Sequence, residues 1–203
     1  MGQLFVIDLF LSTSSSTDMG LSLWIVPSPS ESERLQPIIE DLAKHGEGPV
    51  FQPHVTLVSF PISTPLPLPP FGFDQAPPMT LRFLKVQTGQ SYFQSVLIAI
   101  ERSSALLNIH NSVRQTLDHL LLPNGSYFPH LSLFYGGDQE LKESLVQRLF
   151  EQGTAVSDKG EAGDAVAGIS EIHVEEIWLV RSEGPPEAWE VLERWKLGTS
   201  ISR

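Results

Sequence analysis

Short stretches in which hydrophobic residues alternate with polar ones, or follow one another directly, predict strands along most of the chain. These stretches are residues 21–26, 54–57, 80–87, 92–100, 130–133, 169–181 and 188–197. Three other segments repeat hydrophobic residues every three or four positions, as helices with one buried face do. They are residues 30–44, 102–122 and 138–152. Strands outnumber helices, and helices separate pairs of strands, so the pattern predicts an α+β fold with antiparallel sheets.

Capping residues set the expected limits of two of these helices. Ser30 or Ser32 can cap the first helix, and Gly46 lies beyond its end. Pro37 falls inside the same segment, so it either kinks the helix or moves its true start to a later residue. Asp138 is the expected N-cap of the third helix.

Three segments are predicted to lie outside the regular structure. Residues 61–78 contain seven prolines, which indicates a surface connection, because proline cannot donate a backbone hydrogen bond. A docking motif for an SH3-like partner is the less favoured alternative. Residues 153–168 are rich in alanine, glycine and acidic side chains and predict a flexible insertion. Residues 1–18 predict a disordered N-terminal extension, which leaves residues 19–203 as a single domain.

Length and composition are those of a compact enzyme-sized domain. The chain has 203 residues, of which 41% are hydrophobic, enough for one sizeable core. There is no cysteine, which excludes disulfides, thiolate nucleophiles and zinc–thiolate sites and fits a reducing compartment such as the cytoplasm. No stretch is long enough to span a bilayer. A secretory signal begins with a basic region, whereas no Lys or Arg precedes Arg34 in this chain. We expect a monomer with no membrane span.

Net charge narrows the range of partners. The formal charge is −11, whereas affinity for long nucleic acids comes largely from Lys and Arg side chains that neutralise phosphates. This balance predicts that the chain does not bind long nucleic acid. A small phosphorylated molecule in a shielded pocket is still compatible with it.

The strongest signal is a seven-residue pattern that occurs twice. Residues 51–57 read FQPHVTL and residues 127–133 read YFPHLSL, so both have the order aromatic, any residue, Pro, His, aliphatic, hydroxyl, Leu. Proline is tolerated at the first residue of a strand and pushes the residue before it into an extended conformation. Pro53 and Pro129 therefore predict two strands that begin at His54 and His130.

Alternation along these strands puts each histidine beside a hydroxyl. His54 and Thr56 share one face of the first strand, as His130 and Ser132 share one face of the second. Of two imidazoles, one can accept a proton while the other, still charged, donates one, and the hydroxyls can hydrogen-bond phosphoryl oxygens. The set suits hydrolysis of a strained cyclic phosphodiester. His54 and His130 are the candidate catalytic residues, and Thr56 and Ser132 the candidate substrate-binding residues.

These two motifs carry a family resemblance. HVTL at 54–57 and HLSL at 130–133 resemble the paired H-x-[ST]-x tetrapeptides of the 2H phosphoesterases. Within that superfamily, several segments resemble the fungal and plant 2′,3′-cyclic-nucleotide 3′-phosphodiesterases. They are residues 23–27, 51–60, 89–101 and 128–136, with an ending at 184–192 that resembles the fungal branch.

The resemblance implies a fold, a reaction and a set of roles. It implies a two-lobed fold with outer helices and pseudo-twofold symmetry about a central cleft. It also implies hydrolysis of nucleoside 2′,3′-cyclic phosphates to nucleoside 2′-phosphates without a metal or other cofactor, and a physiological substrate, ADP-ribose 1″,2″-cyclic phosphate, formed in tRNA splicing. His130 would be the base and His54 the acid. In plant and fungal members a tyrosine at the position of Tyr135 contacts the substrate; regular alternation would turn this side chain away, but a bulge would re-aim it.

Other aromatic and imidazole side chains are assigned to structural positions. Trp24 is interpreted as a core aromatic in preference to a substrate contact, and Tyr92 and Phe93 are not assigned to the site. Trp189, Val191 and Trp195 are expected on one face of the last strand, in the core. Outside the motifs, His110 and His119 are interpreted as structural, and His45 and His173 belong to no motif.

Two other functions remain open on the sequence alone. The chain can be a 2H phosphoesterase that acts on RNA ends, which the scarcity of basic residues disfavours. It can also be a nucleotide-binding module without catalysis, which the intact histidines and hydroxyls disfavour. Location is equally open, because composition fits the cytoplasm whereas fungal members of the family are associated with the Golgi apparatus.

Overall fold

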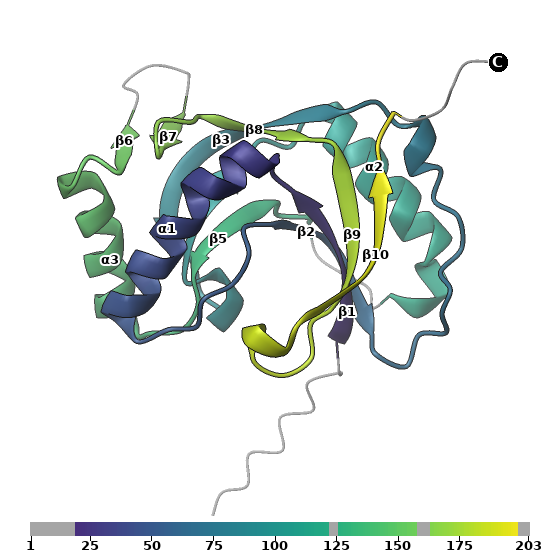
Figure 1. Cartoon of the computed structure of the whole chain (residues 1–203), viewed down its shortest axis with the longest axis horizontal. Coiled ribbons are helices and arrows are strands. Elements are labelled where there is room, and N and C mark those ends of the chain that lie inside the picture. The colour runs from purple at the N-terminus through teal and green to yellow at the C-terminus, as the bar shows by residue number, and fades with distance from the viewer. Residues whose placement is uncertain (1–18, 122–125, 158–162, 199–203) are drawn as a thin grey trace, which may run out of the picture.

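A computed structural model of the chain describes residues 19–121, 126–157 and 163–198. Eight antiparallel strands form one curled sheet in the order β10-β9-β1-β2-β5-β4-β3-β8 (Figure 1). The strands are β1 (Met19–Val26), β2 (Val55–Pro61), β3 (Met79–Thr88), β4 (Val96–Ile100), β5 (His130–Phe134), β8 (Glu171–Val174), β9 (Glu176–Arg181) and β10 (Glu190–Lys196). The helices are α1 (Pro29–Gly46), α2 (Ser104–Thr116) and α3 (Gln139–Glu151). The predicted α+β class and antiparallel pairing are confirmed.

The sheet divides into two halves that repeat one arrangement. β2 and β5 are the two central strands, and four strands lie on each side of the boundary between them. In the first half α1 connects β1 to β2 and contacts β5, and in the second half α2 follows β4, precedes β5 and contacts β2. Each connecting helix thus covers the central strand of the other half, with α1 and α2 on opposite sides of the molecule (Figure 1). This exchange is the pseudo-twofold, two-lobed arrangement that the resemblance implied.

The first helix begins earlier than predicted. Its N-cap is Ser28, so the expectation of Ser30 or Ser32 is wrong. The Ser28 backbone N–H and hydroxyl both donate to the Glu31 carboxylate, at 3.0 and 2.8 Å, and Pro29 follows at the first helical position, which needs no N–H donor. Pro37 stays inside the helix, where burial of the apolar face offsets its missing hydrogen bond. The third helix starts as predicted, since the Asp138 Oδ1 accepts from the Leu141 backbone N–H at 2.9 Å.

Three predicted elements differ from the observed ones in their limits. Tyr92–Gln94 forms a turn of 3₁₀-helix before β4 instead of part of a strand. The helix predicted at 102–122 is shorter, because Ser103 caps α2 and Asp118–Leu120 forms a separate 3₁₀ turn. The strand predicted at 169–181 is two strands, since β8 pairs with β3 while β9 pairs with β1.

The segment predicted as a flexible insertion is a hairpin in its described parts. β6 (Ala155–Ser157) pairs with β7 (Asp164–Val166), and residues 158–162 lie outside the described residues. The buried Asp164 carboxylate accepts a hydrogen bond from the Val86 backbone N–H at 2.8 Å. The hairpin is therefore fixed to β3 by a charge-assisted bond, which composition does not reveal.

The proline-rich connection at 61–78 carries no strand beyond Pro61, as predicted. Phe71 and Phe73 of this connection contact Trp195 of β10, with ring centroids 6.1 and 5.5 Å apart. The connection is therefore packed against the sheet on one side of the molecule. The predicted extension at 1–18 lies outside the described residues. None of the helices within 19–121, 126–157 and 163–198 is both long and apolar enough to cross a membrane.

Candidate active site

The two repeated motifs meet at the centre of the sheet. β2 and β5 are paired at Val55 and Leu131, the residues that follow the two motif histidines. This pairing places the histidine–hydroxyl face of each strand against the same cavity, which has a volume of about 260 Å³. The five residues predicted from the sequence all line it; they are His54, Thr56, His130, Ser132 and Tyr135. Their catalytic and binding roles remain predictions.

Both imidazoles are held by the same kind of hydrogen bond to a backbone carbonyl. The His54 Nδ1 lies 2.7 Å from the Gln52 carbonyl oxygen, and the His130 Nδ1 lies 2.9 Å from the Phe128 carbonyl oxygen. A carbonyl oxygen only accepts hydrogen bonds, so each Nδ1 carries the hydrogen and donates it. Each Nε2 is then the atom left for proton transfer. In both motifs the accepting residue precedes the proline, so the X-Pro-His sequence itself sets the tautomer.

His54 is the more buried of the two motif histidines. Its ring stacks on Trp24, with centroids 3.6 Å apart and an angle of 8° between the planes. Burial lowers the pKa of His54 to about 4; the Gln52 carbonyl acts in the opposite direction, and the nearby His130 lowers the pKa further. In the ligand-free protein His54 is therefore neutral at neutral pH.

His130 is more exposed to solvent than His54. It is only half-buried, and its ring lies beside the exposed Phe128, with centroids 5.4 Å apart. Burial lowers the pKa of His130, and the Phe128 carbonyl partly opposes this shift. Because a charge on one imidazole disfavours a charge on the other, the pair takes up its first and second protons in separate steps.

The two hydroxyls differ in their partners. The Ser132 Oγ donates to the Phe93 carbonyl oxygen at 2.8 Å. The Thr56 side chain is half-buried beside the cavity, and its hydroxyl has no hydrogen-bond partner among the described residues. A ligand oxygen can therefore accept from Thr56 without breaking an existing bond, whereas Ser132 would have to release Phe93 first.

Tyr135 reaches the cavity because β5 is irregular. The β4–β5 pairing runs from Leu97–Ser132 to Val96–Phe134, so Leu133 is an extra residue on β5. Such a bulge reverses which face the following side chains occupy, as the sequence analysis anticipated. Tyr135 stacks on Phe51, with centroids 3.8 Å apart, and burial raises the pKa of its hydroxyl. The hydroxyl is therefore a neutral donor at any physiological pH.

Sequence reasoning missed several residues that line the same cavity. Trp24, Phe93 and Trp189 contribute aromatic surface, although Trp24 and Trp189 were assigned to the core and Phe93 to no site. For Trp24 the signal was present: Leu21, Leu23 and Ile25 are core residues, so alternation puts Trp24 on the other face of β1, opposite Thr56 of β2.

The expectation of Trp189, Val191 and Trp195 on one face is wrong. A register shift between Val191 and Glu193 reverses the faces of β10. Val191 packs with Trp24 and Trp178, whereas Trp195 packs with Phe71 and Phe73 on the other side. Trp189 packs against the same cluster as Val191 and also lines the cavity, with its ring centroid 5.5 Å from that of Trp24.

The part of the chain that the structure describes contains no cluster of metal-ligating side chains. Within it, no three His, Cys, Asp or Glu side chains converge closely enough to hold a metal ion. The polar groups of the cavity are instead two imidazoles and several hydroxyls, which are proton donors and acceptors.

Comparison with known proteins agrees with this geometry. The model of the family described as cyclic phosphodiesterase-like protein matches residues 19–64 and 73–197, which is most of the chain and includes both motifs. The chain belongs to the cyclic phosphodiesterase-like family. This membership confirms the 2H phosphoesterase superfamily and identifies the chain as a hydrolase of the phosphodiesterase type. The fungal and plant subfamily remains a prediction. No curated protein matches the chain.

Solved structures share the fold of this cyclic phosphodiesterase-like chain. Thermus thermophilus TT0787 is 20% identical, with a TM-score of 0.55, over 90% of this chain and 100% of that one. LigT of E. coli, crystallised with 3′-AMP, is 17% identical, with a TM-score of 0.52, over 88% of this chain and 98% of LigT. At these identities the likeness establishes the fold alone, and it spans both halves of the sheet.

Proposed function

We propose that the chain hydrolyses nucleoside 2′,3′-cyclic phosphates to nucleoside 2′-phosphates, with the two motif histidines as acid and base and without a metal. One observation carries the proposal: two imidazoles, each fixed through Nδ1 to a backbone carbonyl, line one small cavity between hydroxyl groups. Membership in the cyclic phosphodiesterase-like family supports the same class of substrate.

The reaction needs one proton removed and one supplied. His130 Nε2 takes a proton from water as the water oxygen forms a bond to phosphorus. The bond from phosphorus to the 3′ oxygen breaks, and protonated His54 gives its Nε2 proton to that oxygen. The product carries the phosphate on the 2′ oxygen. The proton gained by His130 then has to pass to His54 to restore the starting state, so no net proton is consumed by the pair.

The environments of the two rings support these roles. His130 is only half-buried and so remains accessible to water, as a base that activates water requires. His54 lies against the face of Trp24, and an aromatic face stabilises a cation placed over it. Although burial lowers the His54 pKa in the ligand-free protein, an anionic cyclic phosphate beside the ring raises it again. Binding of substrate thereby protonates the acid.

The rest of the cavity suits a nucleoside. Thr56, Ser132 and Tyr135 supply hydroxyl groups for phosphoryl oxygens, and Phe93 at the edge, 55% exposed, offers a face on which a base can stack. LigT, which shares the fold, has been crystallised with 3′-AMP and with NADP+. ADP-ribose 1″,2″-cyclic phosphate, which combines an adenine nucleotide with a cyclic phosphate, is the physiological substrate that we propose.

The purified chain should convert adenosine 2′,3′-cyclic phosphate to adenosine 2′-phosphate in EDTA, with the product isomer identified by ³¹P NMR. ADP-ribose 1″,2″-cyclic phosphate should be hydrolysed as well. Loss of turnover in EDTA with recovery on adding Mn²⁺ would sink the metal-free scheme. An oligonucleotide with a cyclic phosphate end that is strongly preferred over the mononucleotide would favour the RNA-end alternative. Tight binding without any product would favour a nucleotide-binding module.

A further inference from the structure

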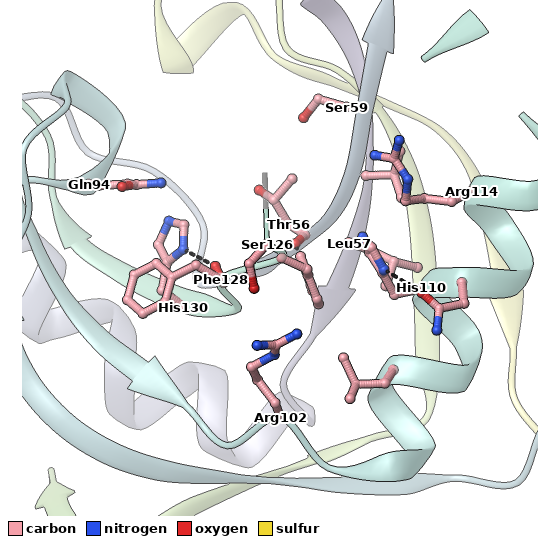
Figure 2. Close-up of a pocket in the computed structure, with 14 residues that line it drawn as sticks. Thr56, Leu57, Ser59, Gln94, Arg102, His110, Arg114, Ser126, Phe128 and His130 are labelled. Carbon is pink, nitrogen blue, oxygen red and sulfur yellow. Dashed lines mark hydrogen bonds between the residues drawn. The ribbon is translucent and has the colours of Figure 1, made fainter. Parts of the chain in front are cut away.

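A second cavity opens directly from the first. It has a volume of about 610 Å³ and lies between the central strands and α2 (Figure 2). Four residues line both cavities, namely Thr56, Ser59, Gln94 and His130, so the two form a continuous space with His130 at the junction. A molecule held at the histidine pair can therefore extend into the second cavity without leaving the protein surface.

The second cavity carries a positive charge that is unusual for this chain. The chain has 24 acidic and 13 basic residues, excluding histidine. Nevertheless, the described residues that line this cavity include Arg102 and Arg114 and no Asp or Glu. A concave surface with one sign of charge concentrates ligands of the opposite sign. The local field thus opposes the net charge of the molecule.

The two arginines act on one region, although twelve positions separate them. Arg102 lies just before α2 and Arg114 in its last turn, and Figure 2 shows both guanidinium groups reaching into the space beside Thr56 and Ser126. His110 lies between them on the same helix. Burial lowers its pKa, and the charges of Arg114 and Arg102 lower it further, so the fields of both arginines meet at this ring.

The wall beside the arginines is held by ring stacking and a hydrogen bond. His110 stacks on Tyr127, with ring centroids 3.9 Å apart and 11° between the planes. The Tyr127 hydroxyl donates to the Thr56 backbone carbonyl at 3.1 Å, which ties this wall to the strand that carries the predicted phosphate-binding hydroxyl. This packing thus fixes the position of the second cavity relative to Thr56.

We propose that Arg102 and Arg114 bind a second phosphoryl group of the substrate, carried on the 5′ oxygen of the ribose whose cyclic phosphate lies between His54 and His130. This inference rests on the proposed function. In a nucleoside 2′,3′-cyclic phosphate the cyclic phosphate occupies the 2′ and 3′ oxygens and the base occupies C1′, so a further phosphoryl group can be attached only through the 5′ oxygen. One guanidinium group can donate two parallel hydrogen bonds to two phosphoryl oxygens, which a lysine ammonium cannot do.

The occupant is a small molecule with a 5′-diphosphate and not an RNA strand. A volume of about 610 Å³ falls within the range of pockets that enclose one small ligand. An RNA chain would continue beyond the cavity over a surface with a net charge of −11, which repels further phosphates. Two arginines offset most of the charge of a single diphosphate.

The test compares two substrates that differ only at the 5′ position. Adenosine 5′-diphosphate 2′,3′-cyclic phosphate and adenosine 2′,3′-cyclic phosphate are assayed separately, and the ratio of their kcat/KM values is taken. The wild-type ratio should be about a hundredfold in favour of the diphosphate, since two arginines take part and each charge-assisted contact contributes about tenfold. Arg102→Gln and Arg114→Gln should each lower the ratio about tenfold. Lys44→Gln, which removes one positive charge from an exposed position outside both cavities, should leave the ratio unchanged.

Several outcomes would overturn the proposal. A wild-type ratio near one, or a ratio that both arginine variants preserve, would contradict it. A dinucleotide ending in a cyclic phosphate that surpasses the diphosphate, with the same dependence on the arginines, would assign the cavity to RNA instead. If the wild-type chain hydrolyses neither substrate, the proposed function fails, and calorimetry with inorganic pyrophosphate decides the cavity separately. The proposed phosphoryl site is supported if pyrophosphate binds the wild type and Lys44→Gln but not Arg102→Gln or Arg114→Gln. It is refuted if all four proteins bind pyrophosphate equally, or if none binds it.

Discussion

Replacing either motif histidine with alanine should lower kcat on adenosine 2′,3′-cyclic phosphate by about a hundredfold to ten-thousandfold, the usual contribution of a general acid or base. The physical reason is that each Nε2 handles a different proton. Without His130 the attacking water keeps its proton, and without His54 the 3′ oxygen departs as an unprotonated alkoxide. Initial rates measured at saturating substrate test the prediction, because they report the chemical step and not binding.

The matched controls separate catalysis from folding. His54 is buried against Trp24, so His54→Gln, which better fills the space, should accompany His54→Ala. His119 is exposed on a 3₁₀ turn outside both cavities, and His119→Ala should keep full activity. Thermal unfolding of each variant checks that it is folded. A folded His54→Gln or His130→Ala with more than about a tenth of wild-type kcat would rule out the assigned roles.

The second largest effect is expected from the Thr56 hydroxyl. Thr56→Val keeps the shape of the side chain and removes its only donor, so kcat/KM should fall about a hundredfold, as when one donor to a developing oxyanion is lost. Ser132→Ala should cost less, about tenfold, because the Ser132 hydroxyl already donates to the Phe93 carbonyl at 2.8 Å. Steady-state kinetics on the same cyclic nucleotide measures both.

Thr80 provides the control for this comparison. It lies exposed on β3, away from both cavities, so Thr80→Val makes the same chemical change without touching the site. Its kcat/KM should equal that of the wild type. If Ser132→Ala proved more damaging than Thr56→Val, the order of importance inferred from the hydrogen bonds would be reversed.

The centre of the fold could be predicted because local signals and tertiary structure agree there. The strand starts predicted from the two prolines, His54 and His130, lie within one residue of the observed starts, and alternation puts His54 and Thr56 on one face. Burial of Val55 on the opposite face enforces that alternation. The pairing of β2 with β5 is a long-range contact that neither motif encodes by itself. The resemblance supplied it.

The missed features arise from register and long-range packing. The shift after Val191 on β10 reverses a face, and a periodic pattern has no means of locating such an insertion. The hairpin of β6 and β7 depends on the bond from Asp164 to the Val86 backbone, which joins residues 78 positions apart. Arg102 and Arg114 were overlooked because helical periodicity identifies the buried face, whereas their importance comes from the cavity beside it.

The central claim is that two imidazoles share one phosphoryl group, and a pH titration of their Nε2 resonances by ¹⁵N NMR tests it most directly. In the ligand-free chain both rings should titrate below the ordinary 6.5, His54 near 4. One equivalent of adenosine 2′-phosphate should shift both Nε2 signals with a single dissociation constant and raise the apparent pKa of His54. A ligand that moves only one ring, or two rings that titrate near 6.5 whether or not it is bound, would contradict the account.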